Sequence, residues 1–578
     1  MAYSIRRALT LTERSDLSAY SDVLAHILFH RGLITMQSAE QFIAPAYDTG
    51  THDPFLLKDA EKSAERIIRA IQRNEKIVIY SDYDADGIPG AALFNDFLKR
   101  IGYANYIIYI PHRHNEGFGV HIEAVEKLAA EGVRLLITID CGITDVKPIA
   151  RAKELGIDVI VTDHHEPPAE LPPAFAIIDH RQADCLYPDK NLCGSGVAYK
   201  LIQAVLKKNR FGLKEGIEKW LLDLVGIATM SDMVPLTGEN RIFAHYGLAV
   251  LRKSPRKGLM QLFHKLKMSQ RHLTEDDIAF MITPRINAAS RMGVPMDAFR
   301  LLAADTDTDA YRYAEHLDAI NNERKGIVAS LVKEVKKTVR ERHGTSIPNV
   351  IVLGNPLWRP SLLGLAANSC AEEFNRPVFL WGRAGDNVIK GSCRSEGTSS
   401  VVQLMRAVPT GMFFQFGGHH HSGGFEVTDE QIHFLEQRLN EAAGKVENEK
   451  RQEGGASGKD AEDNMIDAEL SIDAVDSALH EDVNKLAPFG VGNPKTLFLF
   501  RNVSPSAVRK FGKTRDHMEL VFKKSNGDKI SAISFFGATS DWAKVAKADK
   551  PLDLIASIEK SMYRNKAELR LRVVEVIF

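Results

Sequence analysis

Short apolar runs alternate with segments of helical periodicity between about residue 58 and residue 180. Four of the apolar runs occupy residues 77–80, 106–110, 135–139 and 158–162. In the intervening segments, such as 60–73, apolar side chains recur three or four residues apart, as they do along a helix face. Apolar strands separated by helices are typical of a parallel sheet covered on both faces. The pattern therefore predicts an α/β domain with a parallel sheet, which we assign to residues 58–300.

The periodicity changes after residue 300. Residues 310–342 contain no proline and one glycine and carry apolar side chains at three-to-four spacing. This pattern predicts a long connecting helix within 301–345, although a plain surface helix has the same periodicity. Apolar runs at 349–353, 377–380 and 388–391 then predict a smaller α/β domain over 346–442. Residues 443–464 are charged and rich in glycine, so we expect a flexible linker there.

Five short alternating segments follow the expected linker. They lie at residues 496–500, 518–522, 529–534, 552–558 and 568–576. Five strands in about 100 residues suit a small β-barrel, and we expect an OB-like domain over 465–578, although periodicity does not separate a barrel from a sandwich. Residues 1–57 have mixed helical spacing and no evident chemistry, so we interpret them as a helical packing segment.

The composition narrows the class of protein. A chain of 578 residues is too long to fold around one hydrophobic core, so its length agrees with several domains. The formal net charge of −1 gives no overall attraction to nucleic acid, so any such binding requires a local basic surface. The 5 cysteines show no paired metal-binding spacing, and no run is long and apolar enough for a membrane span. We therefore expect a soluble cytoplasmic protein with reduced thiols.

The first predicted strand opens into an acidic turn. Asp82, Asp84 and Asp86 occupy alternate positions before Gly87. Three neighbouring carboxylates disfavour joint ionisation unless a positive charge lies among them. Mg²⁺ and Mn²⁺ prefer such oxygen ligands, and glycine permits a sharp turn behind them. An acidic surface turn is the alternative interpretation.

Two further predicted strands end in residues of the same chemistry. One runs into Asp140 and the other into Asp163, His164 and His165. Ligands of open parallel sheets bind beyond the carboxyl ends of the strands, so we expect these side chains to meet the acidic turn at one sheet edge. A fourth carboxylate, Asp232, ends a predicted helix. An isolated Asp there is more often a solvated or capping residue.

Two glycine-rich segments of the second domain are interpreted as polar loops, at 391–395 and 417–425. Small residues beside Arg and Ser suit close approach of the backbone to a phosphate. The second segment contains three consecutive histidines, 419–421, which could indicate a transition-metal site. Adjacent side chains do not converge readily on one ion, so we disfavour that alternative.

These motifs together resemble a known superfamily. The four signature motifs of the DHH phosphoesterases resemble residues 82–87, 140–142, 163–165 and 232, and the glycine-rich motif of the associated DHHA1 domain resembles 417–424. The likeness spans about residues 50–578 and narrows to the bacterial RecJ-type single-strand exonucleases. The segments that carry the narrower likeness are 110–119, 192–198, 283–288, 391–395 and 488–494.

The resemblance implies a two-metal centre and assigns its ligands. Two Mn²⁺ or Mg²⁺ ions would be held by Asp82, Asp84, Asp140, His164 and Asp232. Asp140 would bridge the ions, and His165 would be catalytic as a donor to the scissile phosphate or a support for the ligands. Asp86 and Asp163 would orient the ligands.

The resemblance also implies a 5′→3′ exonuclease specific for single-stranded DNA, acting in recombination and repair. Its 5′-phosphate would be bound by Arg113, Ser392 and Arg394, and its path would be lined by Arg285, Asn287, Arg291 and His419. The terminal barrel would hold the incoming strand through Arg509, Lys510, Phe511, Lys513, Arg515 and His517. Single-strand-binding protein and a RecQ-type helicase would be partners of a monomeric enzyme.

The chain departs from the family pattern in three places. It reads Trp-Arg-Pro-Ser at 358–361 where Trp-His-Pro-Gly is usual, and Ser290 stands where the pattern has glycine. Asp179 and His180 occupy positions where Asn-Pro is common. None of these departures falls on an expected metal ligand, so they bear on how the strand is handled.

Three other functions fit parts of the pattern. A DHH phosphodiesterase acting on short oligoribonucleotides or a cyclic dinucleotide would share the metal centre but would not need the terminal barrel. A catalytically silent single-strand-binding scaffold would not need intact metal ligands. An inorganic pyrophosphatase would also leave the barrel unexplained.

Overall fold

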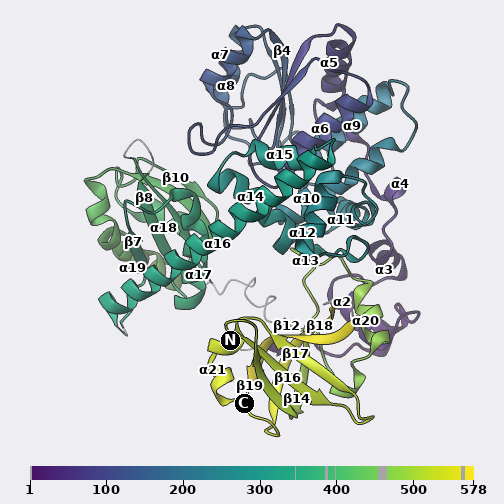
Figure 1. Ribbon diagram of the computed structural model, residues 1–578, viewed down its shortest axis with the longest axis vertical. Helices are drawn as coiled ribbons and strands as arrows, with labels where there is room; N and C mark the ends of the chain where they lie inside the picture. The colour runs from purple at the N-terminus through teal and green to yellow at the C-terminus, as the bar shows by residue number, and fades with distance from the viewer. Residues whose placement is uncertain (1–2, 345, 384–387, 397–398, 453–464, 562–566) are drawn as a thin grey trace. The chain divides into compact units, whose positions relative to one another are not determined.

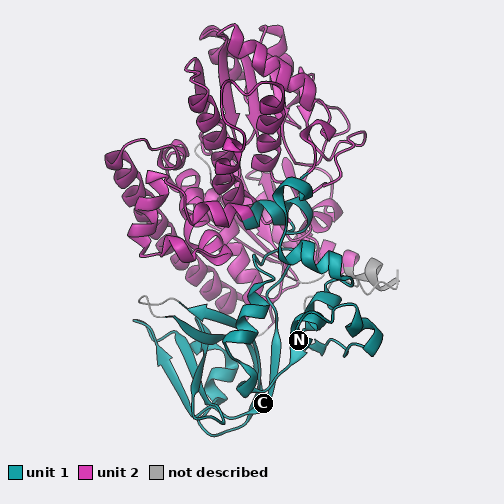
Figure 2. Ribbon diagram, turned by 90° about the vertical axis from the view of Figure 1, so that its right-hand side faces the viewer, with its two compact units in different colours: residues 1–51, 235–245, 461–578 teal, residues 52–234, 246–460 magenta. Residues whose placement is uncertain are grey.

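The computed structural model divides the chain into two compact units. Unit 1 comprises residues 1–51, 235–245 and 461–578, and unit 2 comprises residues 52–234 and 246–460 (Figure 2). The structure describes residues 3–344, 346–383, 388–396, 399–452, 465–561 and 567–578.

Unit 2 begins with a five-stranded parallel sheet of order β3-β2-β4-β5-β6. Its strands are β2 (Lys76–Ser81), β3 (Tyr106–Tyr109), β4 (Val133–Ile139), β5 (Asp158–Thr162) and β6 (Ala176–Ile178). The predicted parallel sheet is confirmed, and the first four strands lie where the apolar runs placed them. The sequence analysis missed β6 because three residues are too few to show a period.

Helices cover both faces of this sheet (Figure 1). On one face, α7 (Ile122–Ala130) and α8 (Val146–Glu154) pack against Val78, Leu136 and Val159. The helices assigned to the other face are α5 (Ala60–Gln72), α6 (Gly87–Arg100) and α9 (Gly194–Lys208). Double coverage explains why the strands are apolar throughout.

A helical region follows the sheet. Its elements are η2 (Ile217–Leu221), α10 (Leu222–Ser231), α12 (Lys257–Leu266), η3 (Gln270–His272), α13 (Glu275–Asp277), the π-helix η4 (Ile278–Ile282), α14 (Thr283–Met292) and α15 (Met296–Leu302). Helix α11 (Gly238–Leu251) also lies here in sequence, and its residues 238–245 belong to unit 1. Nine of the ten residues of α10 are buried, so its C-cap, Asp232, lies at the end of a firmly packed helix.

The predicted long helix is present as α16 (Asp307–His343), which has 37 residues. Thr306 caps its start by accepting a hydrogen bond from the Asp309 amide at 3.1 Å. Its far end contributes Leu331, Val335 and Val339 to the core of the second domain of unit 2. The helix therefore connects the two domains, as predicted.

The second domain contains a mixed sheet of order β10-β11-β9-β8-β7. The strands are β7 (Ile351–Gly354), β8 (Val378–Arg383), β9 (Ile389–Arg394), β10 (Gln415–Gly418) and β11 (Ser422–Val427). Its helices are α17 (Pro360–Phe374), α18 (Val401–Ala407), η5 (Gln431–Phe434) and α19 (Leu435–Gln452).

The interpretation of 391–395 and 417–425 as polar loops was wrong. Most of these residues lie in β9, β10 and β11, which pair antiparallel. Glycine is required where rings cover the strands: a Cβ on Gly391 would lie 2.0 Å from the Phe425 ring. Low side-chain content therefore reflects close packing across the sheet, which a single strand does not reveal.

The expected linker was also partly wrong. Helix α19 continues to Gln452, so residues 443–452 are helical. Alanine, glutamate and lysine in this stretch are good helix formers, and the helix is anchored by buried Leu435, Leu439 and Ala442. The rest of the expected linker, 453–464, lies outside the described residues.

Unit 1 contains a seven-stranded sheet of order β13-β14-β18-β19-β17-β16-β15. The strands are β13 (Ala468–Glu469), β14 (Phe498–Val503), β15 (Ala507–Phe511), β16 (His517–Lys523), β17 (Lys529–Ser534), β18 (Leu552–Ser561) and β19 (Glu568–Ile577). All five predicted strands are present. The sequence analysis missed β13, which is very short, and β15, which is half polar. The helices of this region are η6 (Ile472–Ala474), α20 (Ser477–Asn484), η7 (Gly537–Thr539) and α21 (Asp541–Val545).

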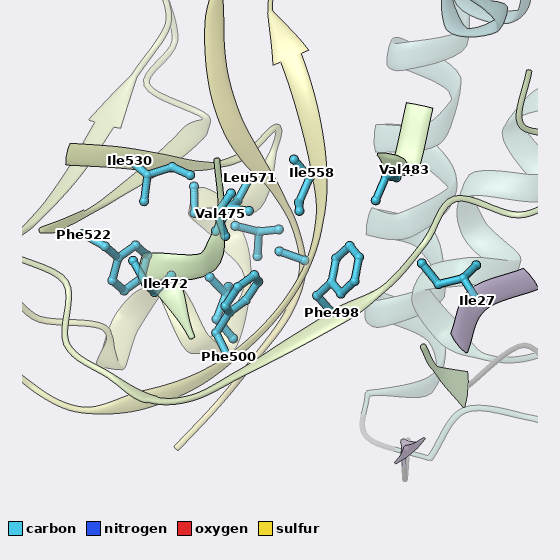
Figure 3. Close-up of a cluster of buried hydrophobic side chains, with 14 of the residues drawn as sticks. Ile27, Ile472, Val475, Val483, Phe498, Phe500, Phe522, Ile530, Ile558 and Leu571 are labelled. Atoms are coloured by element: carbon cyan, nitrogen blue, oxygen red, sulfur yellow. The ribbon is translucent and has the colours of Figure 1, made fainter. Parts of the chain in front are cut away.

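The N-terminal segment packs onto this C-terminal sheet within unit 1. Ile27 lies in one buried cluster with Val483, Phe498 and Phe500 (Figure 3). Strand β1 (Ser4–Ile5) also pairs with β12 (Met465–Ile466). The other N-terminal elements of unit 1 are α1 (Leu11–Ser15), α2 (Asp22–His30), α3 (Met36–Ile43) and α4 (Tyr47–Gly50), whereas η1 (Pro54–Leu56) belongs to unit 2. The predicted packing role of this segment is thus directed at the C-terminal domain.

None of the helices in the described ranges combines the length and apolar character that a bilayer crossing requires.

Ile27→Ala is expected to destabilise unit 1 by about 2–5 kcal/mol, because it removes fully buried methyl groups and leaves a cavity. Ile34→Ala is the matched control, since Ile34 is 51% exposed. Hydrogen exchange of the β14 and β18 amides should accelerate in the first variant and not in the second. Equal exchange in both variants would show that the N-terminal helices do not stabilise the C-terminal sheet.

Candidate metal centre

The acidic turn after β2 is fixed by glycine and by backbone hydrogen bonds. Asp84 Oδ1 accepts from the amides of Asp86 at 2.7 Å and Gly87 at 3.2 Å. A Cβ on Gly87 would lie 2.5 Å from the Asp82 carbonyl oxygen, so only glycine allows this turn. Asn287 Oδ1 accepts from the Ala85 amide at 2.9 Å and holds the turn from outside. The carboxylates of Asp82 and Asp84 thereby reach the end of the sheet.

Asp140 occupies a conformation that is rare for a residue with a side chain. Its φ is +59°, in the left-handed region. Its amide donates to the Thr162 carbonyl at 3.0 Å. A Cβ on Gly194, the first residue of α9, would lie 2.6 Å from the Asp140 Cβ. The neighbouring strand and the close approach of α9 therefore hold Asp140 in this strained position.

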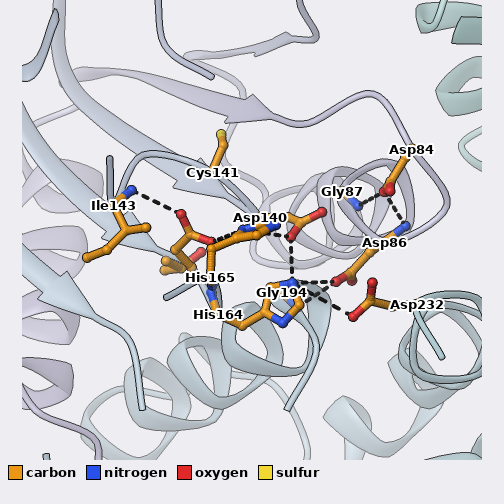
Figure 4. Close-up of polar contacts among 12 residues, drawn as sticks. Asp84, Asp86, Gly87, Asp140, Cys141, Ile143, His164, His165, Gly194 and Asp232 are labelled. Atoms are coloured by element: carbon orange, nitrogen blue, oxygen red, sulfur yellow. Dashed lines mark hydrogen bonds and ion pairs between the residues drawn. The ribbon is translucent and has the colours of Figure 1, made fainter. Parts of the chain in front are cut away.

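The residues from all four motifs converge at this edge (Figure 4). His164 Nε2 lies 3.1 Å from Asp140 Oδ1, 3.7 Å from Asp232 Oδ2 and 3.9 Å from Asp86 Oδ2. Three groups of ligand atoms each lie within 4.8 Å of one another: Asp82, Asp84 and Asp140; Asp140, His164 and His165; and Asp86, His164 and Asp232. The predicted convergence at one sheet edge is confirmed.

Two carboxylate oxygens in this cluster have no hydrogen-bond partner among the described residues. They are Asp82 Oδ1 and Asp140 Oδ1, and both are buried. Buried polar atoms are nearly always hydrogen-bonded. Oxygens that accept no hydrogen bond, one of them 3.1 Å from the neutral His164 Nε2, therefore fit a bound cation. The donor set of carboxylates and one imidazole suits Mn²⁺ or Mg²⁺.

The pKa values of the clustered side chains also indicate that the site needs a bound cation. Burial, followed by repulsion from neighbouring carboxylates, raises the pKa of Asp82 and Asp140 well above the usual range and that of Asp232 to about 9. Burial lowers the pKa of His164 to about 3, which leaves its imidazole neutral and able to ligate a metal. The protein groups alone do not neutralise this concentration of carboxylates.

Asp86 contacts the backbone of α9 and also belongs to the ligand cluster. Its carboxylate accepts hydrogen bonds from the amides of Gly194 at 2.6 Å and Ser195 at 2.7 Å, at the N-terminus of α9. These contacts fit the orienting role expected for it. The same carboxylate also belongs to the ligand group of His164 and Asp232, which the sequence analysis did not predict.

Asp163 orients His165. Its Oδ1 accepts from His165 Nδ1 at 2.7 Å and from the His164 amide at 2.8 Å, and its Oδ2 accepts from the Ile143 amide at 3.0 Å. Burial lowers the pKa of His165, but the bond to Asp163 and its negative charge outweigh burial and raise that pKa to about 9. Without metal ions in the cluster, His165 is therefore a cation at neutral pH.

A cavity of about 1190 Å³ begins beside the ligand cluster within unit 2. Tyr83, between two of the ligands, lines it, as does Phe118, whose ring lies 5.6 Å from the His165 ring. Three predicted substrate residues also line it, namely Arg113, Arg291 and Ser392. The sequence analysis did not identify Tyr83 or Phe118 as cavity residues, although both belong to segments that carry the family resemblance.

The other predicted substrate residues lie elsewhere. Arg285 is 4% exposed, and its Nη2 donates to Asp318 Oδ1 at 2.8 Å, so its guanidinium joins α14 to α16 and does not line the cavity. Asn287 supports the acidic turn. Arg394 donates to its neighbouring carbonyl, that of Cys393, at 2.7 Å and lies against Gly364. His419 is exposed in the β10–β11 turn.

Comparison with known families agrees with this architecture. Residues 76–229 match the DHH family N-terminal domain, residues 348–448 match the DHHA1 domain, and residues 466–575 match the RecJ OB domain.

Solved structures share the fold. A crystal structure of exonuclease RecJ bound to manganese is 31% identical, with a TM-score of 0.58, and covers 67% of this chain and 95% of that chain. RecJ from Thermus thermophilus in complex with Mn²⁺ has a TM-score of 0.80 at 24% identity and covers 99% of this chain and 79% of that chain.

Curated relatives extend over most of the sequence. A Bacillus subtilis protein named single-stranded-DNA-specific exonuclease RecJ is 33% identical over 91% of this chain, which spans 64% of that relative's length. The Haemophilus influenzae protein of the same name is 31% identical over 84% of each chain. With identity above 30% over most of a full relative and all three domains matched, this chain belongs to the RecJ family of single-stranded-DNA-specific exonucleases.

Proposed function

We propose that this chain is a metal-dependent exonuclease that hydrolyses the phosphodiester bonds of single-stranded DNA from the 5′ end during recombination and repair. The observation that carries the proposal is the convergence of Asp82, Asp140, His164 and Asp232 around unpaired carboxylate oxygens at one sheet edge. The names of the relatives supply the substrate class.

Asp82, Asp84, Asp140, His164 and Asp232 would hold two Mn²⁺ or Mg²⁺ ions. Bound ions of this kind lower the pKa of water and neutralise charge on a phosphodiester during in-line attack. Asp140 belongs to two of the three ligand groups, which supports its expected position between the ions.

His165 would supply a donor beside the centre. Asp163 fixes its Nδ1, so its Nε2 is free to donate to a non-bridging phosphate oxygen. A donor held in advance stabilises the charge that accumulates as the water attacks. Asp163 would thus act by positioning His165.

Arg113 and Ser392 would receive the 5′-phosphate, because both line the cavity that opens from the centre. Arg394 lies two residues beyond Ser392 on β9 and would support that site. Recognition of the terminal phosphate would give the enzyme its 5′→3′ polarity.

The sheet domain of unit 1 would hold the incoming strand. Phe511 and His517 form a ring contact at 5.1 Å on the β15–β16 hairpin, next to the basic residues predicted there. Phe536 is 72% exposed, and its ring lies 4.9 Å from that of His517. Exposed aromatics beside cationic side chains bind single strands by stacking and charge.

The family resemblance supports three finer proposals. The enzyme would act as a monomer, it would cooperate with single-strand-binding protein and a RecQ-type helicase, and it would work in the cytoplasm, where bacterial DNA is repaired.

Digestion of end-labelled oligonucleotides tests the function. The purified chain should degrade a 5′-phosphorylated single strand from its 5′ end with Mn²⁺ or Mg²⁺, spare duplex DNA and stop with chelator. Asp140→Asn should lower the rate at least about 1,000-fold, because a shared ligand loses its charge. Exposed Asp541→Asn, far from the centre in sequence, is the control and should retain the wild-type rate.

Two results would contradict the proposal. Activity confined to the dinucleotide pApA would indicate an oligonucleotide phosphodiesterase. Undiminished digestion by the Asp140→Asn variant would place the activity at another site or in a contaminating enzyme.

Metal removal should make stability fall as pH rises. The folded-state pKa of Asp232, about 9, exceeds its value of about 3.9 in the unfolded chain, so the folded state binds more protons between these values. Stability is therefore greatest at low pH within this window and declines towards pH 9, and the raised pKa of His165 acts in the same direction. Differential scanning fluorimetry should show a lower Tm at pH 8.5 than at pH 6.5 without metal, and Mn²⁺ should restore it.

Asp232→Asn is the matched control for this pH dependence. The variant removes one buried titrating group, so its metal-free Tm should depend less on pH than that of the wild type. A metal-free wild-type Tm that rises from pH 6.5 to pH 8.5 would contradict the assignment of buried, protonated carboxylates to the centre.

A further inference from the structure

Three arginines without carboxylate partners line the cavity beside the metal centre. They are Arg113, Arg291 and Arg359, and none forms an ion pair with any described residue. Two other basic side chains that line the cavity do form ion pairs. Arg383 pairs with Asp429, and Lys390 pairs with Glu426 at 2.8 Å. The three guanidiniums bring positive charge to the cavity wall without a direct ion pair, and the acidic charges that act on them are those of the ligand cluster, Asp82 on Arg113 and Asp84 on Arg291.

Arg113 is the nearest of the three to the metal ligands. Its guanidinium lies 5.0 Å from the centroid of the Tyr83 ring, and Tyr83 stands between two metal ligands in the acidic turn. The cavity therefore carries cationic side chains from its beginning at the ligand cluster.

Arg291 is held by a reciprocal pair of hydrogen bonds. Its Nη1 donates to the Ser361 carbonyl at 3.0 Å, and Ser361 Oγ donates to the Arg291 carbonyl at 2.9 Å. These bonds join the end of α14 to the first turn of α17. The guanidinium is thus fixed at the cavity wall, which lowers the entropy lost when it binds a ligand.

Arg359 lies beside this pair. It is the N-cap residue of α17, and its Nη1 approaches the Met292 sulfur at 4.0 Å, next to Arg291 in the chain. Its side chain is exposed, and it lines the same cavity as Arg113 and Arg291. The positive end of the α17 dipole adds to the potential at this position.

We infer that Arg359 binds a backbone phosphate of the single strand, next to the phosphate contacted by Arg291. The inference rests on the proposed function and extends it to a residue for which the family pattern gives no role, since this position departs from that pattern. An arginine presents a planar fork of donors that suits phosphate oxygens, and crowded guanidiniums gain most from an anionic ligand. A strand phosphate supplies that anion at regular spacing.

Binding of a 5′-phosphorylated oligo-dT to the Asp140→Asn protein, measured by fluorescence anisotropy, tests the inference. Adding Arg359→Ala should weaken binding about 10-fold and make the slope of log K against log salt shallower by about 0.7, the value for one phosphate contact on a single strand. Arg359→Lys should recover part of the affinity, because it keeps the charge and loses the fork. Arg342→Ala, at an exposed arginine of α16, is the control and should match the parent.

Oligonucleotides with one neutral methylphosphonate each locate the contact. At one position the neutral linkage should weaken binding to the parent and leave binding to the Arg359→Ala variant unchanged. An Arg359→Ala variant that binds like Arg342→Ala, with the same salt slope, would overturn the inference. Independent losses at every methylphosphonate position would overturn it as well.

The proposed function is tested separately in the same protein series. If the chain carrying the native Asp140 does not digest single strands, the proposed function fails. If it does so and the Arg359 substitution leaves binding unchanged, only the phosphate contact fails.

Discussion

Repulsion among buried carboxylates at the carboxyl edge of the β3-β2-β4-β5-β6 sheet is the constraint on which the rest of this structure depends. Some of these carboxylates accept hydrogen bonds from the protein itself. Asp86 accepts from two backbone amides at the start of α9, and Asp163 accepts from His165. The fold leaves oxygens of Asp82 and Asp140 unpaired and strains the backbone of Asp140 to keep them there. Such an arrangement is stabilised either by protons on the carboxylates or by positive charge among them, and two divalent cations would supply that charge at neutral pH.

The features that sequence predicts here follow from rules that act over short distances. Apolar strands between helices indicate a parallel sheet, and parallel strands place their carboxyl ends at one edge. Asp82, Asp140 and His164 could therefore be brought together from the residues alone. Asp232 could not, because an aspartate at a helix end looks like an ordinary cap, and only the family resemblance assigned it to the centre.

The predictions that failed depend on partners distant in sequence. The glycine-rich segments are strands because Phe425 covers Gly391 across the sheet, which neither segment reveals alone. The expected substrate role of Arg285 stays a prediction, because its guanidinium donates to Asp318 where α16 packs against α14 and does not line the cavity. The packing of separate elements also creates the cavity. Arg359 lines this cavity together with Arg113 and Arg291, which the residues next to it in sequence do not predict. Local pattern therefore predicted the sheet edge where the acidic residues meet, whereas the substrate residues were assigned by the family resemblance.

Anomalous diffraction from crystals grown with Mn²⁺ would show whether cations occupy this sheet edge. We expect two manganese peaks there, with Asp140 contacting both and with Asp82, Asp84, His164 and Asp232 completing the two sites. Crystals without manganese at this edge, or with manganese only at other residues, would show that these carboxylates do not form a metal centre.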